Sequence, residues 1–145
     1  MNTTSDGSAN VLAALGQGLP MLLLHFGLVL VLLIVGMLVY MAVTPFHERE
    51  LVRRGNAAAA TVLGGALVAL AIPLAALLAT TGALLDIIAW GVVAVVLQLV
   101  TVLVVSLLLR GMRAMIEAGQ VAAAIPLVAA QLSIALLNAA VMIPA

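Results

Sequence analysis

The sequence predicts an all-α integral membrane protein in which four transmembrane helices form two parallel two-helix repeats. Three observations lead to this fold class. The 145 residues are 67% hydrophobic and 7% charged, whereas a soluble domain is about half apolar and about a quarter charged. Four apolar runs are each long enough to cross ~30 Å of hydrocarbon, which takes about 20 helical residues. A short motif also recurs 64 positions along the chain, where residues 119–124 (GQVAAA) echo residues 55–60 (GNAAAA).

The recurrence extends beyond this motif, because Phe26-Gly27 matches Trp90-Gly91 at the same offset. Each unit would consist of an apolar helix, a short amphipathic connector, a glycine and an Ala-rich helix. An even number of spans per unit makes the two units parallel, related by an axis along the membrane normal. The predicted division is a tail at residues 1–19 and a membrane domain at residues 20–145, with repeat one at 20–81 and repeat two at 84–145.

The first predicted helix begins at Pro20 and ends at Val43, and His25 is its only strongly polar residue. The other three cover about residues 57–80, 84–109 and 120–142. The tail before Pro20 is expected to fray or to lie on the membrane surface. It lacks the basic segment of a cleavable signal peptide, so we expect it to be retained.

Two polar connectors join the helices within each repeat. In the first, Thr44-Pro45 is interpreted as the N-cap and first position of a short surface helix. Gly55 ends that helix, and Asn56 is well suited to cap the next one. In the second connector, residues 110–119, an apolar stripe ends at a glycine, which predicts another short interfacial helix. The stripe consists of Met112, Met115 and Ile116.

The connectors hold every basic side chain other than histidine: Arg49, Arg53, Arg54, Arg110 and Arg113. Three of these have an acidic partner about one helical turn away, in Glu50–Arg54, Glu50–Arg53 and Arg113–Glu117. Because positive charge collects on the inner side of a membrane, both connectors are predicted to be cytoplasmic and both termini extracytoplasmic.

Small residues mark the predicted contact faces of the helices, because small side chains let helix backbones approach closely in lipid. The small faces comprise Thr61, Gly65, Ala69 and Pro73 on the second helix and Ala122, Pro126 and Ala130 on the fourth. On the third helix one face is small and polar, with Gly91, Ala94, Gln98 and Thr101.

Three stretches, residues 50–59 (ELVRRGNAAA), 90–98 and 138–140, resemble the YjfL-type bacterial inner-membrane proteins, a four-span family classed as domain of unknown function 350. The resemblance covers roughly residues 21–145, and its second copy departs from the pattern at Gln120, where Asn is expected. It implies a bacterial plasma-membrane location. As cytoplasmic partners it suggests PspA-like phage-shock proteins or ATP-grasp ligases, and it implies no activity.

Gln98 and Gln131 are both predicted near the middle of the bilayer, and Asn138 lies on the same helix face as Gln131. A primary amide in hydrocarbon is costly unless it is paired. A hydrogen bond between helices is therefore favoured over the polar lining of a permeation path, although both interpretations remain open. We predict that Gln98 bonds Gln131 directly or shares a small polar pocket with it.

The remaining polar residues have simple structural interpretations. His25 is favoured as an interfacial anchor over a proton relay, and Asp86 as a cap at the start of the third helix. The group His47, Glu48 and Glu50 is interpreted as a solvated charged helix at the lipid headgroups rather than as a metal or acid–base site.

The second candidate surface lies in the connectors, where matched glycine corners and charges could dock a cytoplasmic protein. Its residues are Glu50, Arg53, Arg54, Gly55, Asn56, Arg113, Gly119 and Gln120.

The chain has no Cys, no nucleophile–base pair, no Gly-rich phosphate loop and no carboxylate dyad, so neither catalysis nor a cofactor or metal is predicted. A net charge of zero gives no argument for nucleic acid. The predicted function is a non-enzymatic, homo-oligomeric scaffold or docking subunit in the lipid bilayer. The alternative is a small transporter or channel subunit with a polar path lined by Gln98, Gln131 and Asn138.

Overall fold

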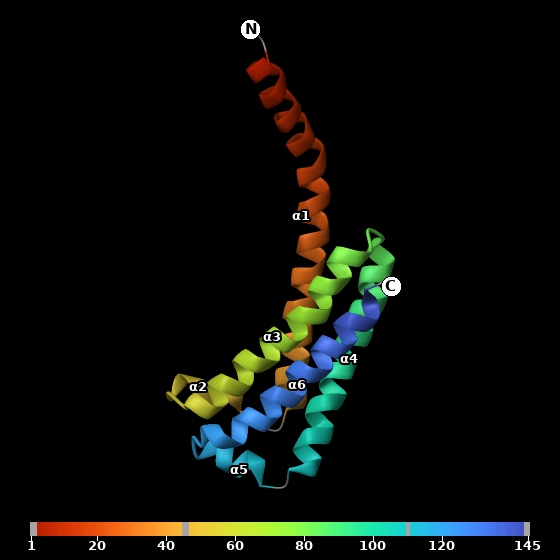
Figure 1. The fold of residues 1–145 in the computed structure, drawn as a ribbon. Helices are drawn as coiled ribbons and strands as arrows, with labels where there is room; N and C mark the ends of the chain where they lie inside the picture. Colours follow the sequence, from red (N-terminus) through yellow and green to blue (C-terminus); the bar gives the residue numbers. More distant parts are fainter. Residues whose placement is uncertain (1–2, 45–46, 110, 144–145) are drawn as a thin grey trace.

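The computed structural model describes residues 3–44, 47–109 and 111–143, with side chains from residue 11 onward. Within these ranges every regular element is an α-helix (Figure 1). Four of them are long and apolar enough to cross a membrane, which confirms the predicted class of all-α, multi-pass membrane protein. The helices are α1 Thr3–Val43, α2 Glu48–Arg53, α3 Ala57–Thr80, α4 Leu84–Leu108, α5 Met112–Glu117 and α6 Val121–Met142.

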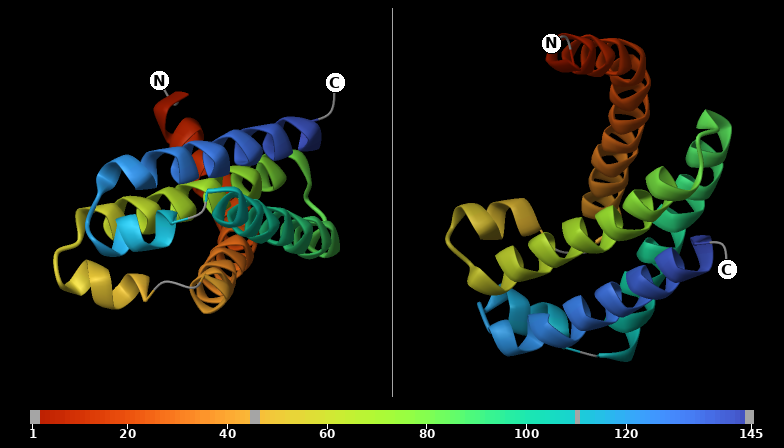
Figure 2. Two further views of the ribbon diagram at one scale, coloured as in Figure 1. Left: turned by 90° about the horizontal axis from the view of Figure 1, so that it is seen from below. Right: turned by 45° about the horizontal axis from the view of Figure 1, so that its top comes forward.

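The long helices α3 and α6 form the centre of the bundle. They lie side by side in both figures, run in the same direction, and share the most extensive interface in the molecule. α4 packs against both of them, whereas α1 packs against α3 and α4. The short helices α2 and α5 lie together at one end of the bundle, here called the connector end. The opposite end, where α3 turns into α4, is called the turn end (Figure 2).

The bounds of α3, α4 and α6 agree closely with those predicted. α3 begins where expected because the Asn56 side chain caps it, with Oδ1 accepting a hydrogen bond of 2.9 Å from Ala59 N–H. It ends at Thr80 because Thr81 has extended backbone angles. The side chain of Thr81 then accepts a bond of 3.2 Å from Ala83 N–H, just before α4 begins.

The first helix is longer than predicted. α1 begins at Thr3, and Pro20 lies inside it instead of opening it, so the boundary between a frayed tail and a helix at residues 19 and 20 is wrong. A proline removes one backbone hydrogen bond and bends a helix but need not end one. Ala13, Ala14 and Leu15, earlier in the same helix, are strong helix formers. The N-terminal part of α1 extends beyond the bundle (Figure 1).

The first connector also begins differently from the prediction. Thr44 is not the N-cap of α2, because its hydroxyl donates a hydrogen bond of 2.7 Å to the Tyr40 carbonyl and so closes the end of α1. His47 occupies the N-cap position of α2. Pro45, predicted as the first helical position, and Arg110, predicted in the second connector, lie outside the described residues.

The apolar stripe of α5 packs mostly on protein. Met112 and Ile116 are buried in a cluster with Ala58 and Leu127, whereas Met115 is 41% exposed. The second connector is therefore part of the bundle core at the connector end and not only a surface helix.

The predicted small face of the second span is largely confirmed. Ala69 and Pro73 of α3 are buried, and Gly65 lies so close to α6 that a Cβ there would be 2.6 Å from Val128. Thr61, at the end of this face, is exposed.

On α4, Gly91, Ala94 and Gln98 are buried as predicted, and Thr101 is partly buried. On α6 the prediction is wrong, because Ala122 and Pro126 are exposed and Ala130 is only partly buried. The inward line of α6 instead comprises Ala123, Ala124, Leu127, Gln131, Ala135 and Ala139. Contact with both α3 and α4 sets its rotation, which the one-helix pattern cannot specify.

Candidate functional site

A chain of buried polar side chains runs from the connector end into the middle of this apolar bundle. It contains one residue from each of four helices: Glu48 on α2, Tyr40 on α1, Gln131 on α6 and Gln98 on α4. None is more than 2% exposed. Polar groups in such an environment are costly unless they bond one another, so their gathering at one place calls for a physical explanation.

The two glutamines make the interhelical contact expected from the sequence, in an unexpected form. The Gln98 amide Nε2 donates a hydrogen bond of 2.9 Å to the backbone carbonyl of Gln131. A carbonyl oxygen has two lone pairs, so it can accept this bond in addition to its bond within the helix. The contact therefore joins α4 to α6 without using the side chain of Gln131.

The other half of the chain joins α1 to α2. The Tyr40 hydroxyl donates a hydrogen bond of 3.2 Å to Oε1 of Glu48. The Gln131 amide reaches toward the same hydroxyl without completing a hydrogen bond of good geometry. The polar groups are thus nearly continuous from the connector Glu48 to Gln98 on α4.

Several atoms of the chain are buried without a hydrogen-bond partner among the described residues. They are Oε2 of Glu48, Oε1 of Gln98, and both Nε2 and Oε1 of Gln131. Because almost all buried polar atoms in native proteins are paired, this number in one cluster is unusual. The amide atoms can form hydrogen bonds with a water or a polar solute, and the Glu48 carboxyl can also bind a proton, whereas a purely structural contact would leave few such atoms.

Glu48 corrects the interpretation of the first connector. The sequence places it among solvated charges, and His47 and Glu50 are indeed exposed, but Glu48 is only 2% exposed. Burial raises the pKa of the Glu48 carboxyl to about 7, and the hydrogen bond from Tyr40 partly offsets this effect. Sequence reasoning missed both Glu48 and Tyr40 as candidate site residues.

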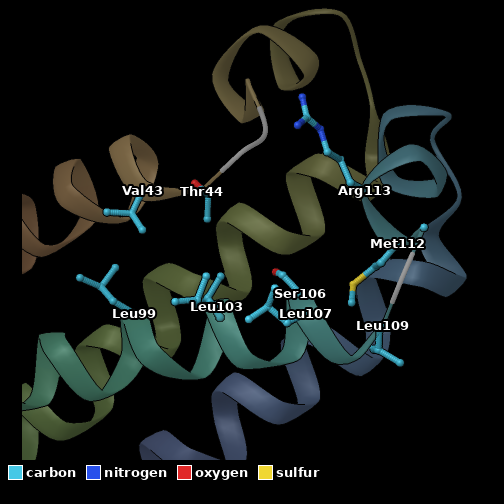
Figure 3. A pocket seen from close by; sticks show the side chains of 11 residues that line it. Val43, Thr44, Leu99, Leu103, Ser106, Leu107, Leu109, Met112 and Arg113 are labelled. Carbon is cyan, nitrogen blue, oxygen red and sulfur yellow. The ribbon is translucent and has the colours of Figure 1, made fainter.

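A hollow of about 240 Å³ lies at the connector end (Figure 3). Thr44 at the end of α1 and Leu99 and Leu103 of α4 form its walls, and Arg113 of α5 also lines it. Its wall includes Ser106, whose buried Oγ has no partner among the described residues. The connector-end hollow is therefore mostly apolar, with a few hydrogen-bonding groups.

A second hollow, of about 600 Å³, lies at the turn end. Asp86 and Trp90 of α4, Thr81 of the turn and Asn138 of α6 contribute to its lining. Asn138 Nδ2 is buried without a partner among the described residues. Asn138 is thus placed away from the Gln98 contact, on the wall of this turn-end hollow.

His25 and Asp86 have structural contacts at the turn end. His25 lies with Nδ1 2.8 Å from the Met21 carbonyl and Nε2 2.9 Å from the Gly82 carbonyl, which ties α1 to the turn and fits the predicted anchor. Asp86 is not the N-cap of α4, since Ala83 occupies that position. It lies in the first turn and accepts a bond of 3.4 Å from the Thr81 hydroxyl.

The two glycine corners have the same backbone geometry. Gly55 and Gly119 have φ angles of 80° and 79°, the left-handed conformation that ends many helices. The same pair of hydrogen bonds closes both corners: Gly55 N–H to Val52 O and Asn56 N–H to Leu51 O at the first, Gly119 N–H to Ile116 O and Gln120 N–H to Met115 O at the second. The full two-helix repeat remains a prediction beyond this local match.

The side chains of the corners differ. Asn56 Nδ2 donates hydrogen bonds of 2.8 Å and 3.1 Å to the carbonyls of Ile116 and Glu117, so it joins the first corner to the last turn of α5. Gln120 makes no side-chain cap bond and is exposed. The predicted docking residues are therefore brought together at the connector end through Asn56.

The charges at the connector end are solvated. Arg54 pairs with Glu50 at 3.0 Å and Arg113 with Glu117 at 2.8 Å, and all four side chains are substantially exposed. Arg53 is exposed as well. Exposed pairs of this kind contribute little to stability. Within the described part of the chain, no group of three His, Cys, Asp or Glu residues could hold a metal ion.

One comparison with known proteins gives a match. A family model described as Domain of Unknown Function (DUF350) matches residues 14–142. No curated protein and no solved structure matches the chain.

Proposed function

The chain belongs to the DUF350 family, and from that premise we propose that it is a small, non-enzymatic transport subunit. In this proposal two hollows at opposite ends of the bundle are separated by buried amides, which form the narrow part of a path for a proton or a small polar solute. The family description names no activity, so the proposal rests on the geometry of this chain.

The position of Gln98 on α4 carries the proposal. Its neighbour Leu97 lines the turn-end hollow, and its neighbour Leu99 lines the connector-end hollow. Gln98 itself is buried between them and bonds α6. The buried amide of Gln98 thus lies on α4 between a residue that lines one hollow and a residue that lines the other, as expected for the constriction of a path.

The unpartnered atoms favour a path over a purely structural contact. A structural amide pair gains from mutual bonding, but the side chain of Gln131 is fully buried with neither polar atom paired among the described residues. Asn138 adds an unpartnered amide on the turn-end hollow, seven residues farther along α6. Polar groups that are kept inside a membrane protein at a cost to stability commonly mark ion or substrate pathways.

We propose a bacterial plasma-membrane location with the connectors in the cytoplasm and both termini outside. The arginines support this orientation, because Arg49, Arg53, Arg54 and Arg113 are all exposed at the connector end. A cysteine introduced as Arg53→Cys should react with an impermeant maleimide only from the cytoplasmic side. Labelling from outside the cell would reverse the proposed direction of the path.

Flux through reconstituted liposomes tests the transport function. Purified protein should dissipate a pH gradient or an alkali-cation gradient faster than empty liposomes do. The double variant Gln98→Leu, Gln131→Leu should lose that flux, because leucine removes the amides without reducing volume much. Gln120→Leu, at the exposed glutamine of the second corner, is the matched control and should retain it. Equal flux from the double variant and wild type would exclude a path through the amides.

Four helices this apolar enclose little water, so we propose that the transport unit is a homo-oligomer. Much of α1 and α4 is apolar and exposed in the single chain, which leaves surface for lipid or for further copies. Crosslinking in native membranes should therefore give discrete multiples of the chain mass.

A scaffold role is the second candidate, and the join between the two corners favours it. Asn56 fixes both connectors into one face that presents Arg53, Arg54 and Arg113. We propose an acidic surface on a cytoplasmic protein as the complementary partner, with a PspA-like or ATP-grasp protein as the candidate that the family resemblance suggests. Changing the three arginines to alanine together should release the partner on mild solubilisation, whereas Gln98→Leu should not.

A further inference from the structure

We propose that Glu48 is the proton-binding group of this protein, and that the species passing along its polar chain is the proton. The inference rests on the proposed transport function for the direction of travel, but the binding of a proton at Glu48 stands on its own geometry. Neither the predicted polar path nor the predicted docking surface includes Glu48.

The first support is that no cation pairs with Glu48 among the described residues. Glu48 is 2% exposed, and both ion pairs found among the described residues involve other acids. An ionised carboxylate that is buried without a cation is strongly disfavoured, and such a group takes up a proton instead. The neutral carboxylic acid is therefore the form that fits this position.

The second support is the small number of hydrogen-bond donors. The Tyr40 hydroxyl donates to Oε1, whereas Oε2 has no partner among the described residues. A carboxylate has about four lone-pair sites to satisfy. One neutral donor falls far short of that need, so ionisation in place would leave charge without hydrogen bonds.

Other elements packed nearby supply no competing charge within the described ranges. α3 and α6 contain no ionisable side chain, and the carboxylate of α4, Asp86, lies at the turn end. On α2, Arg49 and Glu50 are exposed, and on α5 Arg113 is paired with Glu117. Tyr40 of α1 is the titratable group in direct contact with Glu48.

The third support is that a proton has a route to the Glu48 carboxyl from the solution and a route from it into the bundle. Toward the solution, Glu48 is the first residue of a six-residue helix and follows the exposed His47, so a small opening of α2 would wet it. Toward the bundle, the Tyr40 hydroxyl is followed by the Gln131 amide and then by Gln98. A proton from water adds to Oε2 to give the neutral acid, and release to water restores the carboxylate.

The position of α2 explains how uptake and release could alternate. With the acid neutral, Glu48 remains buried against Tyr40. With the carboxylate charged, desolvation favours the open position of α2, in which the charge meets water. The raised pKa of Glu48, about 7, agrees with exchange near neutral pH.

Infrared spectroscopy of the protein in lipid nanodiscs tests proton binding directly. Wild type should show the carbonyl stretch of a protonated carboxyl near neutral pH, and the band should disappear as the pH rises. Glu48→Gln should lack this titrating band. Glu50→Gln is the matched control, because Glu50 is an exposed, ion-paired acid on the same helix, and it should retain the band. A wild-type spectrum with no Glu48-dependent band would show that the carboxyl is ionised and would overturn the proposal.

Tyr40→Phe gives a second readout that a merely structural role would not change. Loss of the hydroxyl removes the bond that favours the ionised form, so the titration midpoint of the band should move to higher pH. If Glu48→Gln does not yield folded protein, this shift decides the proposal. An unchanged midpoint in folded Tyr40→Phe would overturn it.

Flux separates this inference from the proposed function. Proton flux should fall to the level of empty liposomes in Glu48→Gln and remain in Glu50→Gln. If wild type shows the titrating band but no flux, the proposal of a proton site at Glu48 stands and the proposed transport function is excluded. Flux of an alkali cation that is unaffected by Glu48→Gln would retain transport and exclude the proton as the species carried.

Discussion

The join between the two connectors through Asn56 gives the sharpest test of the fold. The perturbation is Asn56→Ala, which removes three side-chain hydrogen bonds: the cap bond from Ala59 N–H and the two bonds to the carbonyls of Ile116 and Glu117. Loss of an N-cap costs about 1 kcal/mol. The two bonds to carbonyls contribute about 1 kcal/mol each at most, and the one to Glu117 is exposed and weaker. We expect a total loss of about 2–3 kcal/mol in the free energy of unfolding.

Gln120→Ala is the matched control for Asn56→Ala, because it alters the equivalent position of the second corner. The backbone bonds of that corner are the same, but its side chain makes no cap bond and is exposed. We expect Gln120→Ala to change stability by no more than about 0.5 kcal/mol. The sequence already differs at these two positions, and the structure shows that the difference has a physical consequence.

Asn56→Asp separates the cap from the bridge between connectors. Aspartate retains the oxygen that accepts from Ala59 N–H but loses the amide donors, and its charge repels the carbonyls of α5. Asn56→Asp should therefore keep the cap of α3 but still reduce the free energy of unfolding by about 1–2 kcal/mol. If Asn56→Asp were as stable as wild type, the hydrogen bonds from Asn56 to the carbonyls of α5 would contribute nothing to stability.

The assay is unfolding in mixed micelles with increasing dodecyl sulfate, followed by the fluorescence of Trp90, the only tryptophan in the chain. Trp90 is on α4, away from the connector end, so a shifted midpoint reports the whole bundle and not a local change at the corner. The reasoning would be refuted by equal midpoints for Asn56→Ala and Gln120→Ala.

Three further predictions use the same assay. Gly65→Ala should cost about 1–3 kcal/mol, because its Cβ would meet an α6 side chain at 2.6 Å, whereas Gly64→Ala has open space and should be neutral or slightly stabilising. Gln98→Leu should reduce stability by about 0.6–2 kcal/mol, whereas Gln131→Leu should reduce it little, because the acceptor of the Gln98 bond is the backbone carbonyl of Gln131. In a double-mutant cycle the two variants should therefore show a coupling energy below about 0.5 kcal/mol. Strong coupling would indicate that the two side chains pair instead. The free energy of unfolding of wild type should fall by about 3 kcal/mol as the pH rises from 4.5 to about 7, since in that window the folded protein binds a proton that the unfolded chain has released. Glu48→Gln should remove this dependence of stability on pH, and an unchanged dependence would assign it to another group.

Helix existence and most helix bounds follow from the sequence because hydropathy and local caps determine them. The bounds of α3 result from Asn56 at its start and the turn at Thr81, both of which are local signals. Family membership was also predictable, since the stretch around Gly55 resembled the family that the match over residues 14–142 confirms. The YjfL type within that family remains a prediction.

The start of α1 and the rotation of α6 were not predictable for different reasons. At Pro20 a local signal for a helix start competed with the helical preference of the preceding residues, and the helix continued. α6 is apolar around nearly its whole circumference, so no amphipathic pattern indicates which side is buried. The exposure of Ala122 and the burial of Ala123 depend on where α3 and α4 lie.

Glu48 was missed because a six-residue helix is too short to display a pattern. Residues 47–50 all carry charge or a histidine, and nothing local distinguishes Glu48 from Glu50. The distinction is made by Tyr40, which faces the connector from the end of α1. A tyrosine near the end of a span is ordinarily an interfacial anchor, so its hydrogen bond to a buried acid is a property of the tertiary structure.

Polar contacts have a particular role in a bundle of this composition. Lipid is as apolar as leucine, so burying one face of a helix rather than another gains little, and rotation must be set by close packing or by hydrogen bonds. Three long-range contacts supply such bonds here: Gln98 joins α4 to α6, His25 joins α1 to the turn, and Asn56 joins α3 to α5. All three donate to or lie against backbone carbonyls, which have fixed positions in or beside a helix. The contact between Tyr40 and Glu48 differs because both groups are side chains and Glu48 is a buried carboxyl. Protonation of that carboxyl changes the charge directly at this contact, so this is a place where a change of charge could move α2 while the bonds of Gln98 and Asn56 to backbone carbonyls hold the other helices.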